Sequence, residues 1–146
     1  MKIDEKVELI CSDTAPIIHV DDDTILLKLV KRFYEKSSLK NTYIPFESGD
    51  EFLEFLNELD RQGKELPLIV LIDINMPGMS GFELLEKIRS RENFKLLPIC
   101  SMLSSSKHPE DIKKSLDLGA NTYLVKPDNA KEYCEFFDSL MDKISA

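Results

Sequence analysis

The stretch LIVLID at residues 68–73 contains five consecutive aliphatic residues and ends on an acid, Asp73. A continuous apolar run of this length is typical of a parallel strand that is buried on both faces. Apolar runs also end on charged residues in IIHV at 17–20, before Asp21 and Asp22, and in TYLV at 122–125, before Lys126. Because ligands of open parallel sheets bind outside the carboxyl ends of the strands, we expect these charged side chains to meet in one shallow site.

Three carboxylates and one ammonium would meet at that edge of the sheet. Carboxylates so close together cannot all stay ionised without a partner of opposite charge. Clustered hard oxygens suit Mg²⁺, which uses few protein ligands and keeps several waters. The set therefore predicts a divalent-metal site in which Asp73 is a reactive carboxylate and Lys126 is a cation that pairs with the group that Asp73 acquires.

Several of these residues also have a purely structural interpretation. An acid before a helix commonly caps the N-terminus of that helix. The run after residue 20 holds three consecutive acids, and a cap needs only one of them. We therefore assign Asp21 and Asp22 to metal chemistry and Asp23 to the cap. His19 and His108 are interpreted as structural or exposed, because neither has the spacing of a metal ligand or a partner for a nucleophile.

The composition limits the class of protein. The chain has 146 residues, the size of one domain, with a formal net charge of −8 and a pI of about 4.8. Such an acidic chain lacks the basic surface that nucleic acids and anionic membranes require, so we expect neither as a partner. Cys11, Cys100 and Cys134 are odd in number and match no zinc pattern, which favours reduced thiols and a cytoplasmic location. No apolar stretch approaches the ~20 residues of a membrane span.

Short apolar runs alternate with amphipathic stretches along the chain, a pattern typical of βα units around a parallel sheet. The expected strands are residues 16–20, 40–45, 67–72, 98–102 and 122–125. The expected helices are residues 23–36, 49–61, 81–90, 109–118 and 129–144. Residues 1–15 form an N-terminal extension, in which residues 6–11 could be an extra edge strand or a frayed tail. We expect no output domain after the last helix.

Several pieces of the chain occur in the order and spacing of one known family. They are VDDD at 20–23, LIDINMPGMSG at 71–81, a serine after the fourth strand, and LGANTYLVKP at 118–127. With them the chain resembles the receiver domain of two-component response regulators over residues 16–144, and is most similar to the single-domain chemotaxis and phytochrome-associated types. The resemblance implies a receiver domain over residues 16–146. It implies an α/β fold with a five-stranded parallel sheet in the order 2-1-3-4-5, in a flavodoxin-like three-layer sandwich.

The resemblance also assigns a role to each site residue. The implied ligands of the cofactor Mg²⁺ are Asp22, Asp73, Asp21 acting mainly through water, and the backbone carbonyl of Asn75. Asp73, Lys126 and Ser104 form the catalytic set, in which Asp73 accepts the phosphoryl group and Lys126 pairs with it. Ser104 and Tyr123 are the switch residues that respond to that group.

The chain departs from the family pattern around the fourth strand. Ser104 lies 22 residues before Lys126, the family's usual interval, whereas counting forward from Asp73 reaches Leu103. This region therefore carries one extra residue. The strand also contains Ser101, which needs a hydrogen-bond partner if the strand is buried.

The resemblance implies a phosphorelay protein whose phosphoryl donor is a histidine kinase or a phosphotransfer protein. Such a chain is not an enzyme for external substrates, because it catalyses only its own phosphorylation and dephosphorylation. Its switched surface is the fourth helix, the fifth strand and the fifth helix, which could form a weak homodimer or bind a downstream target that the sequence does not identify.

Two rival functions are a binding module that lost the switch and a Mg²⁺-dependent phosphohydrolase. The complete set of charged residues argues against the first rival. Asn75 argues against the second, because those hydrolases typically have a second acid at that position.

Overall fold

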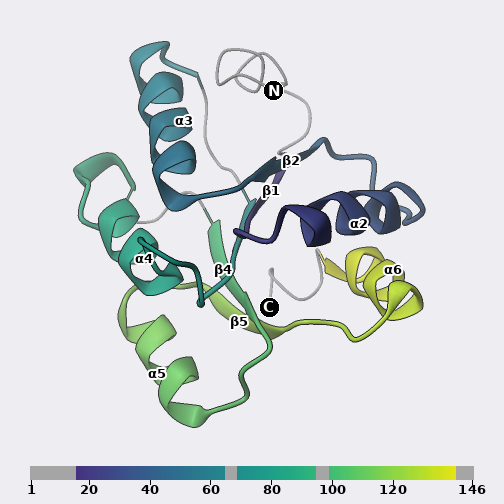
Figure 1. The fold of residues 1–146 in the computed structure, drawn as a ribbon. Coiled ribbons are helices and arrows are strands. Elements are labelled where there is room, and N and C mark those ends of the chain that lie inside the picture. Colours follow the sequence, from purple (N-terminus) through teal and green to yellow (C-terminus); the bar gives the residue numbers. More distant parts are fainter. Residues whose placement is uncertain (1–15, 65–68, 95–98, 141–146) are drawn as a thin grey trace.

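The computed structural model describes residues 16–64, 69–94 and 99–140, and at its centre is a five-stranded parallel sheet (Figure 1). The strands are β1 (Ile17–Val20), β2 (Tyr43–Phe46), β3 (Ile69–Ile72), β4 (Ile99–Ser104) and β5 (Thr122–Val125). Their order is β2-β1-β3-β4-β5, and every neighbouring pair is parallel. The predicted fold class and strand order are confirmed. The predicted N-terminal extension, residues 1–15, lies outside the described residues.

Helices cover both faces of the sheet and complete the predicted three-layer sandwich. They are α2 (Thr24–Glu35), α3 (Gly49–Arg61), α4 (Gly81–Arg89), the 3₁₀ helix η1 (Glu92–Phe94), α5 (Pro109–Asp117) and α6 (Ala130–Asp138). Helices α2 and α6 lie on one face, and α3, α4 and α5 lie on the other (Figure 1). Within the described ranges, no helix combines the length and the apolar composition needed to cross a membrane.

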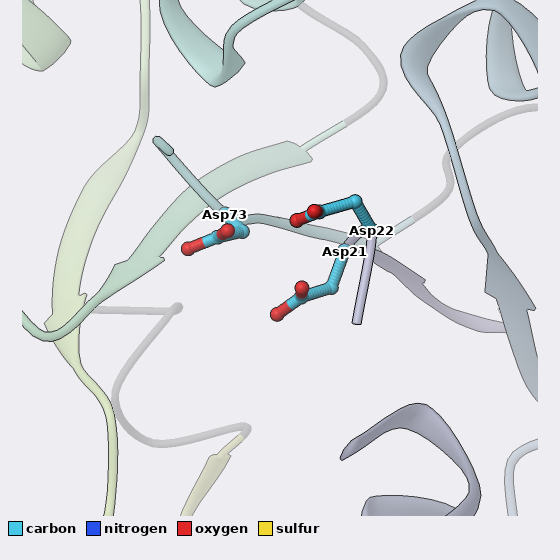
Figure 2. Close-up of side chains that lie close together, drawn as sticks. All are labelled: Asp21, Asp22 and Asp73. Carbon is cyan, nitrogen blue, oxygen red and sulfur yellow. The ribbon is translucent and has the colours of Figure 1, made fainter. Parts of the chain in front are cut away.

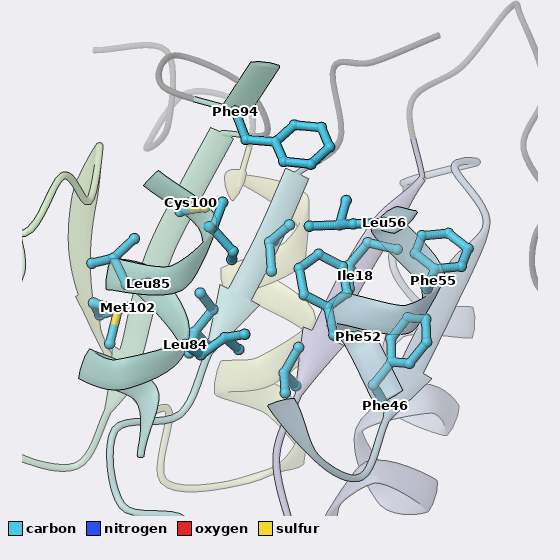
Figure 3. Close-up of a cluster of buried hydrophobic side chains, with 14 of the residues drawn as sticks. Ile18, Phe46, Phe52, Phe55, Leu56, Leu84, Leu85, Phe94, Cys100 and Met102 are labelled. Carbon is cyan, nitrogen blue, oxygen red and sulfur yellow. The ribbon is translucent and has the colours of Figure 1, made fainter. Parts of the chain in front are cut away.

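Each face of the sheet has its own apolar core. Between the sheet and α3–α4, the rings of Phe46, Phe52 and Phe55 pack with centroids 5.0–6.1 Å apart (Figure 3). Between the sheet and α2–α6, the ring of Tyr34 lies 5.4 Å from that of Tyr43 and 5.1 Å from that of Phe137. Each fully buried aromatic side chain stabilises the fold by roughly 1.5–3 kcal/mol. The two cores pack helices against both faces of the sheet, whose strand ends carry the charged residues.

The loop after β3 is shaped by its glycines. Gly78 has φ +79°, as expected for the glycine of a Pro-Gly turn. Ser80 caps α4 by accepting a hydrogen bond from the N–H of Glu83 at 3.2 Å. The N–H of Gly81 donates to the carbonyl of Ile74 at 2.9 Å, and a Cβ at Gly81 would lie only 2.8 Å from the Cα of Ile74. The start of α4 therefore packs directly against the backbone at the end of β3.

Strand β4 is longer than the predicted range of 98–102. Its last two residues pair with Leu124 and Val125 of β5, and this pairing extends the strand to residue 104. Ser101 is fully buried, and its hydroxyl lies 2.6 Å from that of Thr122 on β5. The expected partner of this buried serine is thus the neighbouring edge strand.

Candidate functional site

Three carboxylates meet at the carboxyl ends of β1 and β3 (Figure 2). One oxygen of each of Asp21, Asp22 and Asp73 lies within 4.8 Å of the others. Because Val20 pairs with Ile72 in the register of the two strands, the residues that follow, Asp21 and Asp73, lie side by side. Asp21 is 1% exposed and Asp73 is 6% exposed, whereas Asp22 is exposed. Two of the three acids are therefore largely withdrawn from water.

Lys126 reaches these buried acids from β5. Its backbone N–H donates to the carbonyl of Ser104 at 2.8 Å, which anchors the residue at the end of β4. Its Nζ lies 3.1 Å from Oδ2 of Asp21 and 3.1 Å from Oδ1 of Asp73. Burial disfavours the ammonium form, but the two carboxylates outweigh it and raise the pKa of Lys126. The structure thus brings together the four charged residues that the sequence analysis singled out.

The surroundings of Asp73 disfavour its ionised form. Burial, followed by the neighbouring Asp21 carboxylate, raises the pKa of Asp73 from 3.8 to about 6, although Lys126 opposes the rise. Lys126 therefore offsets only part of the cost of burying this carboxylate beside Asp21. A carboxylate with such a pKa holds its negative charge at a cost, and any added cation would relieve that cost.

The residues present fit a divalent cation. Three carboxylates face a single ammonium, and all the ligating atoms are hard oxygens, the type that Mg²⁺ prefers. Asn75, whose carbonyl the resemblance adds to the ligands, lies in the exposed part of the loop two residues after Asp73. Its role as a ligand stays a prediction.

The two predicted switch residues both contact Ser106, in the loop after β4. Ser104 is 1% exposed, and its hydroxyl accepts a hydrogen bond from the N–H of Ser106 at 3.1 Å. Tyr123 is half-buried, and its hydroxyl donates to the carbonyl of Ser106 at 2.8 Å. Leu103, the alternative switch position, packs in the apolar core under α2 and α6. Ser104 is therefore the residue at the strand end beside Lys126, and its role as a switch stays a prediction.

Asp23 takes the structural position expected of it. Its Oδ1 accepts a hydrogen bond from the N–H of Leu26 at 3.0 Å, and so caps α2. Its own N–H donates to Oδ1 of Asp21 at 3.0 Å. The cap of α2 therefore also helps to orient one of the buried acids.

His19 contacts the site, which its sequence pattern did not predict. His19 is fully buried, with Nδ1 2.7 Å from the hydroxyl of Tyr43 and Nε2 4.0 Å from Oδ2 of Asp21. Burial lowers the pKa of His19 to about 4 despite the nearby Asp21, so the ring is neutral at physiological pH and no ion pair forms. The sequence held one signal of this contact, because residues two apart in a strand point to the same face. His108 is exposed before α5, as expected.

Comparison with known proteins relates this arrangement to a family. The protein-family model for the response regulator receiver domain matches residues 17–137 of this chain. The two-component response regulator ARR17 of Arabidopsis thaliana is 38% identical over 117 residues, which cover 76% of this chain and 74% of that protein. The chemotaxis protein CheY-3 of Vibrio cholerae is 30% identical over 138 residues, which cover 94% of this chain and all of that protein.

A solved structure also has the same fold. The crystal structure of the Mn²⁺-bound form of the response regulator Rcp1 superposes with a TM-score of 0.71. The two proteins are 25% identical, and the match covers 88% of this chain and 93% of that chain. That neighbour binds a divalent cation, the kind of ion that suits the acidic cluster described above.

Proposed function

This chain belongs to the response regulator receiver domain family of two-component signalling, and from that premise we propose that Asp73 accepts a phosphoryl group in a Mg²⁺-dependent reaction. The donor is a histidine kinase or a phosphotransfer protein. The observation that supports this most directly is the position of Lys126 Nζ, 3.1 Å from both Asp73 and Asp21, in a cluster of three acids. An ammonium in this position can pair with a negatively charged group that becomes bound to Asp73.

The proposed transfer exchanges one bond for another. An oxygen of Asp73 attacks the phosphorus of a phosphohistidine, the P–N bond breaks, and its electron pair stays on the imidazole nitrogen of the donor. The product is an acyl phosphate on Asp73 that bears about −2 charge. Lys126 moves from the carboxylate to an oxygen of the phosphoryl group, where it stabilises the charge that has arrived. Water later hydrolyses the acyl phosphate and restores the carboxylate.

Asp21, Asp22, Asp73 and Asn75 would hold the metal ion. A bound Mg²⁺ supplies the positive charge that offsets repulsion between the acids and an incoming phosphoryl group. The raised pKa of Asp73 supports this assignment, because burial and then the Asp21 carboxylate disfavour its ionised form, which a bound cation would stabilise. The chain itself contributes the fixed positions of its carboxylates and the exclusion of water from two of them.

We propose that the phosphoryl donor docks over the start of α2. Ile25, in the first turn of α2, is 71% exposed, and Leu29, one turn further on, is 41% exposed. The two residues are four apart in the helix, so they share one face of α2, on which a partner can bury them together. A concave region of about 490 Å³ is lined by Leu26, Lys126 and Pro127 among others. It extends this surface toward the acids.

The signal would leave through the face formed by α5, β5 and α6. The phosphoryl oxygens recruit the Ser104 hydroxyl from Ser106, and Tyr123, whose hydroxyl is held by the same residue, moves with that loop. This is a two-state element that one local charge change biases. Leu116 and Val125, 48% and 41% exposed, give the face an apolar component suited to a partner or a second copy.

Phosphorylation by acetyl phosphate tests the proposal. We expect intact-protein mass spectrometry to find one phosphoryl group on the wild-type protein with Mg²⁺ and none on Asp73→Asn. Asp22→Asn should need more Mg²⁺. Asp23→Asn is the matched control, because it changes a neighbouring acid to a residue that caps helices equally well, and it should be phosphorylated normally. Phosphate on Ser104 instead of Asp73 would overturn the assignment.

The same samples separate the rival functions. Continuous turnover of p-nitrophenyl phosphate would favour a phosphohydrolase. A folded protein that binds no Mg²⁺ and accepts no phosphoryl group would favour a binding module. We propose a cytoplasmic location, supported by the odd number of cysteines, which is a poor framework for disulfides.

A further inference from the structure

His19 lies directly beneath the acidic site, on the side of the sheet covered by α2 and α6. Its Nδ1 is 2.7 Å from the hydroxyl of Tyr43, and its Nε2 is 4.0 Å from Oδ2 of Asp21. Among the described residues, Nε2 of His19 is the only buried side-chain nitrogen or oxygen that lacks a hydrogen-bond partner. Because buried polar atoms are almost always paired, an orphaned one that faces a functional carboxylate calls for an explanation.

The surroundings of the ring select one tautomer. Burial and then the charge of Asp21 raise the pKa of Tyr43 above its ordinary value, so its phenol keeps a proton that it can donate. If Tyr43 donates to Nδ1, the proton of the neutral ring is on Nε2 and points toward Asp21. The opposite tautomer would aim the lone pair of Nε2 at a carboxylate oxygen in a dry environment, which is repulsive. The geometry therefore favours the Nε2–H form.

The Asp21 carboxylate, which faces His19, has two partners, and one of them, Lys126, can be drawn away. Oδ1 of Asp21 accepts a hydrogen bond from the N–H of Asp23 at 3.0 Å, and Oδ2 is paired with Lys126 at 3.1 Å. Lys126 is shared with Asp73, so a phosphoryl group on Asp73 draws the ammonium away from Asp21. The N–H of His19 is then the buried donor that faces Oδ2.

We propose that His19 is a positioning residue for the acidic site: Tyr43 holds its ring as the Nε2–H tautomer, and Nε2–H hydrogen-bonds and orients the Asp21 carboxylate when a cation or a phosphoryl group displaces Lys126. The part of this role that concerns a metal rests on the proposed function. Hydrogen bonds from outside the ligand set orient ligating carboxylates in this way in other metal sites.

Nuclear magnetic resonance tests the tautomer without any metal. The chain has two histidines, so ¹⁵N-labelled protein in EDTA gives two ring systems, and His108→Asn identifies the signal of His19. We expect the proton on Nε2 in the wild type and a larger share of the Nδ1–H form in Tyr43→Phe, limited by the repulsion from Asp21. Tyr34→Phe is the matched control, because Tyr34 lies next to Tyr43 but its hydroxyl donates to the carbonyl of Asn41. Loss of that hydroxyl should leave the signal of His19 unchanged. A wild-type ring protonated on Nδ1 would overturn the proposal.

Calorimetric titration with Mg²⁺ tests the effect on the site. We expect His19→Leu to raise the Kd by about tenfold, the lower end of the loss seen when such an outer hydrogen bond is removed. His19→Gln, whose amide N–H can replace Nε2–H, should have a Kd closer to that of the wild type than to that of His19→Leu. A folded His19→Leu protein with a wild-type Kd would refute the proposal.

Thermal unfolding establishes whether His19→Leu is folded. If it is not, the same Mg²⁺ titration is made on Tyr43→Phe and on Tyr34→Phe. A higher Kd for Mg²⁺ in Tyr43→Phe alone supports the role of His19, and equal Kd values in the two variants refute it. A wild-type protein that binds no Mg²⁺ would instead overturn the proposed function, and the tautomer measurement in EDTA would still decide whether Tyr43 and Asp21 select the Nε2–H form.

Discussion

Replacing Asp73 with Asn should make the metal-free protein more stable at neutral pH. The side chain of Asp73 is 9% exposed, and its carboxylate lies beside that of Asp21. Burial and this neighbour raise its pKa to about 6 from an ordinary value of 3.8, so the ionised form is disfavoured in the folded state. Asparagine has nearly the same shape and no charge to desolvate. The substitution therefore removes a destabilising charge and retains the packing.

The magnitude follows from the pKa. A difference between 3.8 and about 6, at about 1.4 kcal/mol per pKa unit, corresponds to roughly 3 kcal/mol. Because the pKa of Asp73 is raised in the folded state, the folded protein binds more protons than the unfolded chain between these values, and its stability falls as the pH rises. The advantage of Asp73→Asn should be about 3 kcal/mol near pH 7.5, roughly half of that at pH 5, and below about 1 kcal/mol at pH 4.

Urea unfolding followed by circular dichroism in EDTA measures this difference at each pH. Asp117→Asn serves as the control, because Asp117 is an exposed acid paired with Lys113 on α5. Its stability should stay within about 0.5 kcal/mol of the wild type at every pH. The reasoning is refuted if Asp73→Asn is no more stable than the wild type near neutral pH, or if its advantage does not shrink as the solution is acidified.

Two further outcomes are expected. Gly81→Ala should destabilise the protein by about 1–3 kcal/mol and slow phosphorylation, because its Cβ would press on the backbone carbonyl of Asp73. Gly63→Ala, in open space at φ +65°, should cost about 1 kcal/mol and leave phosphorylation unchanged; equal rates in both variants would contradict this account. In light scattering, Mg²⁺–beryllofluoride should favour self-association through the face that includes Val125, and Leu116→Ser should weaken it, because it replaces an exposed apolar side chain of that face. A molar mass that never changes would exclude that interface.

Much of the fold was predictable because its signals are local. Apolar runs of four to six residues and amphipathic stretches between them indicate βα units without knowledge of any distant contact. The order of strands followed from the family resemblance, and the structure confirms it. Individual boundaries depend on pairing partners. Strand β2 begins at Tyr43 rather than residue 40, and β4 continues to Ser104 because β5 pairs with it.

The sequence by itself determined which charged residues end the strands, because an apolar run followed by Asp or Lys is visible in the chain alone. It also indicated that parallel strands would bring Asp73 and Lys126 to one edge. Only the tertiary structure decided how they share charge. Lys126 bridges two acids rather than one, and this pairing depends on side chains from three strands.

The same distinction applies to His19. A histidine before an acidic run is compatible with an exposed or a buried position, and the sequence offers no local reason to choose. The register of β1 against β2 brings Tyr43 next to its ring, and packing under α2 and α6 removes the ring from water. Registers and burial are set by contacts between residues far apart in the chain. Local sequence patterns thus determined the elements and the chemical groups at their ends, whereas long-range packing decided which of those groups touch.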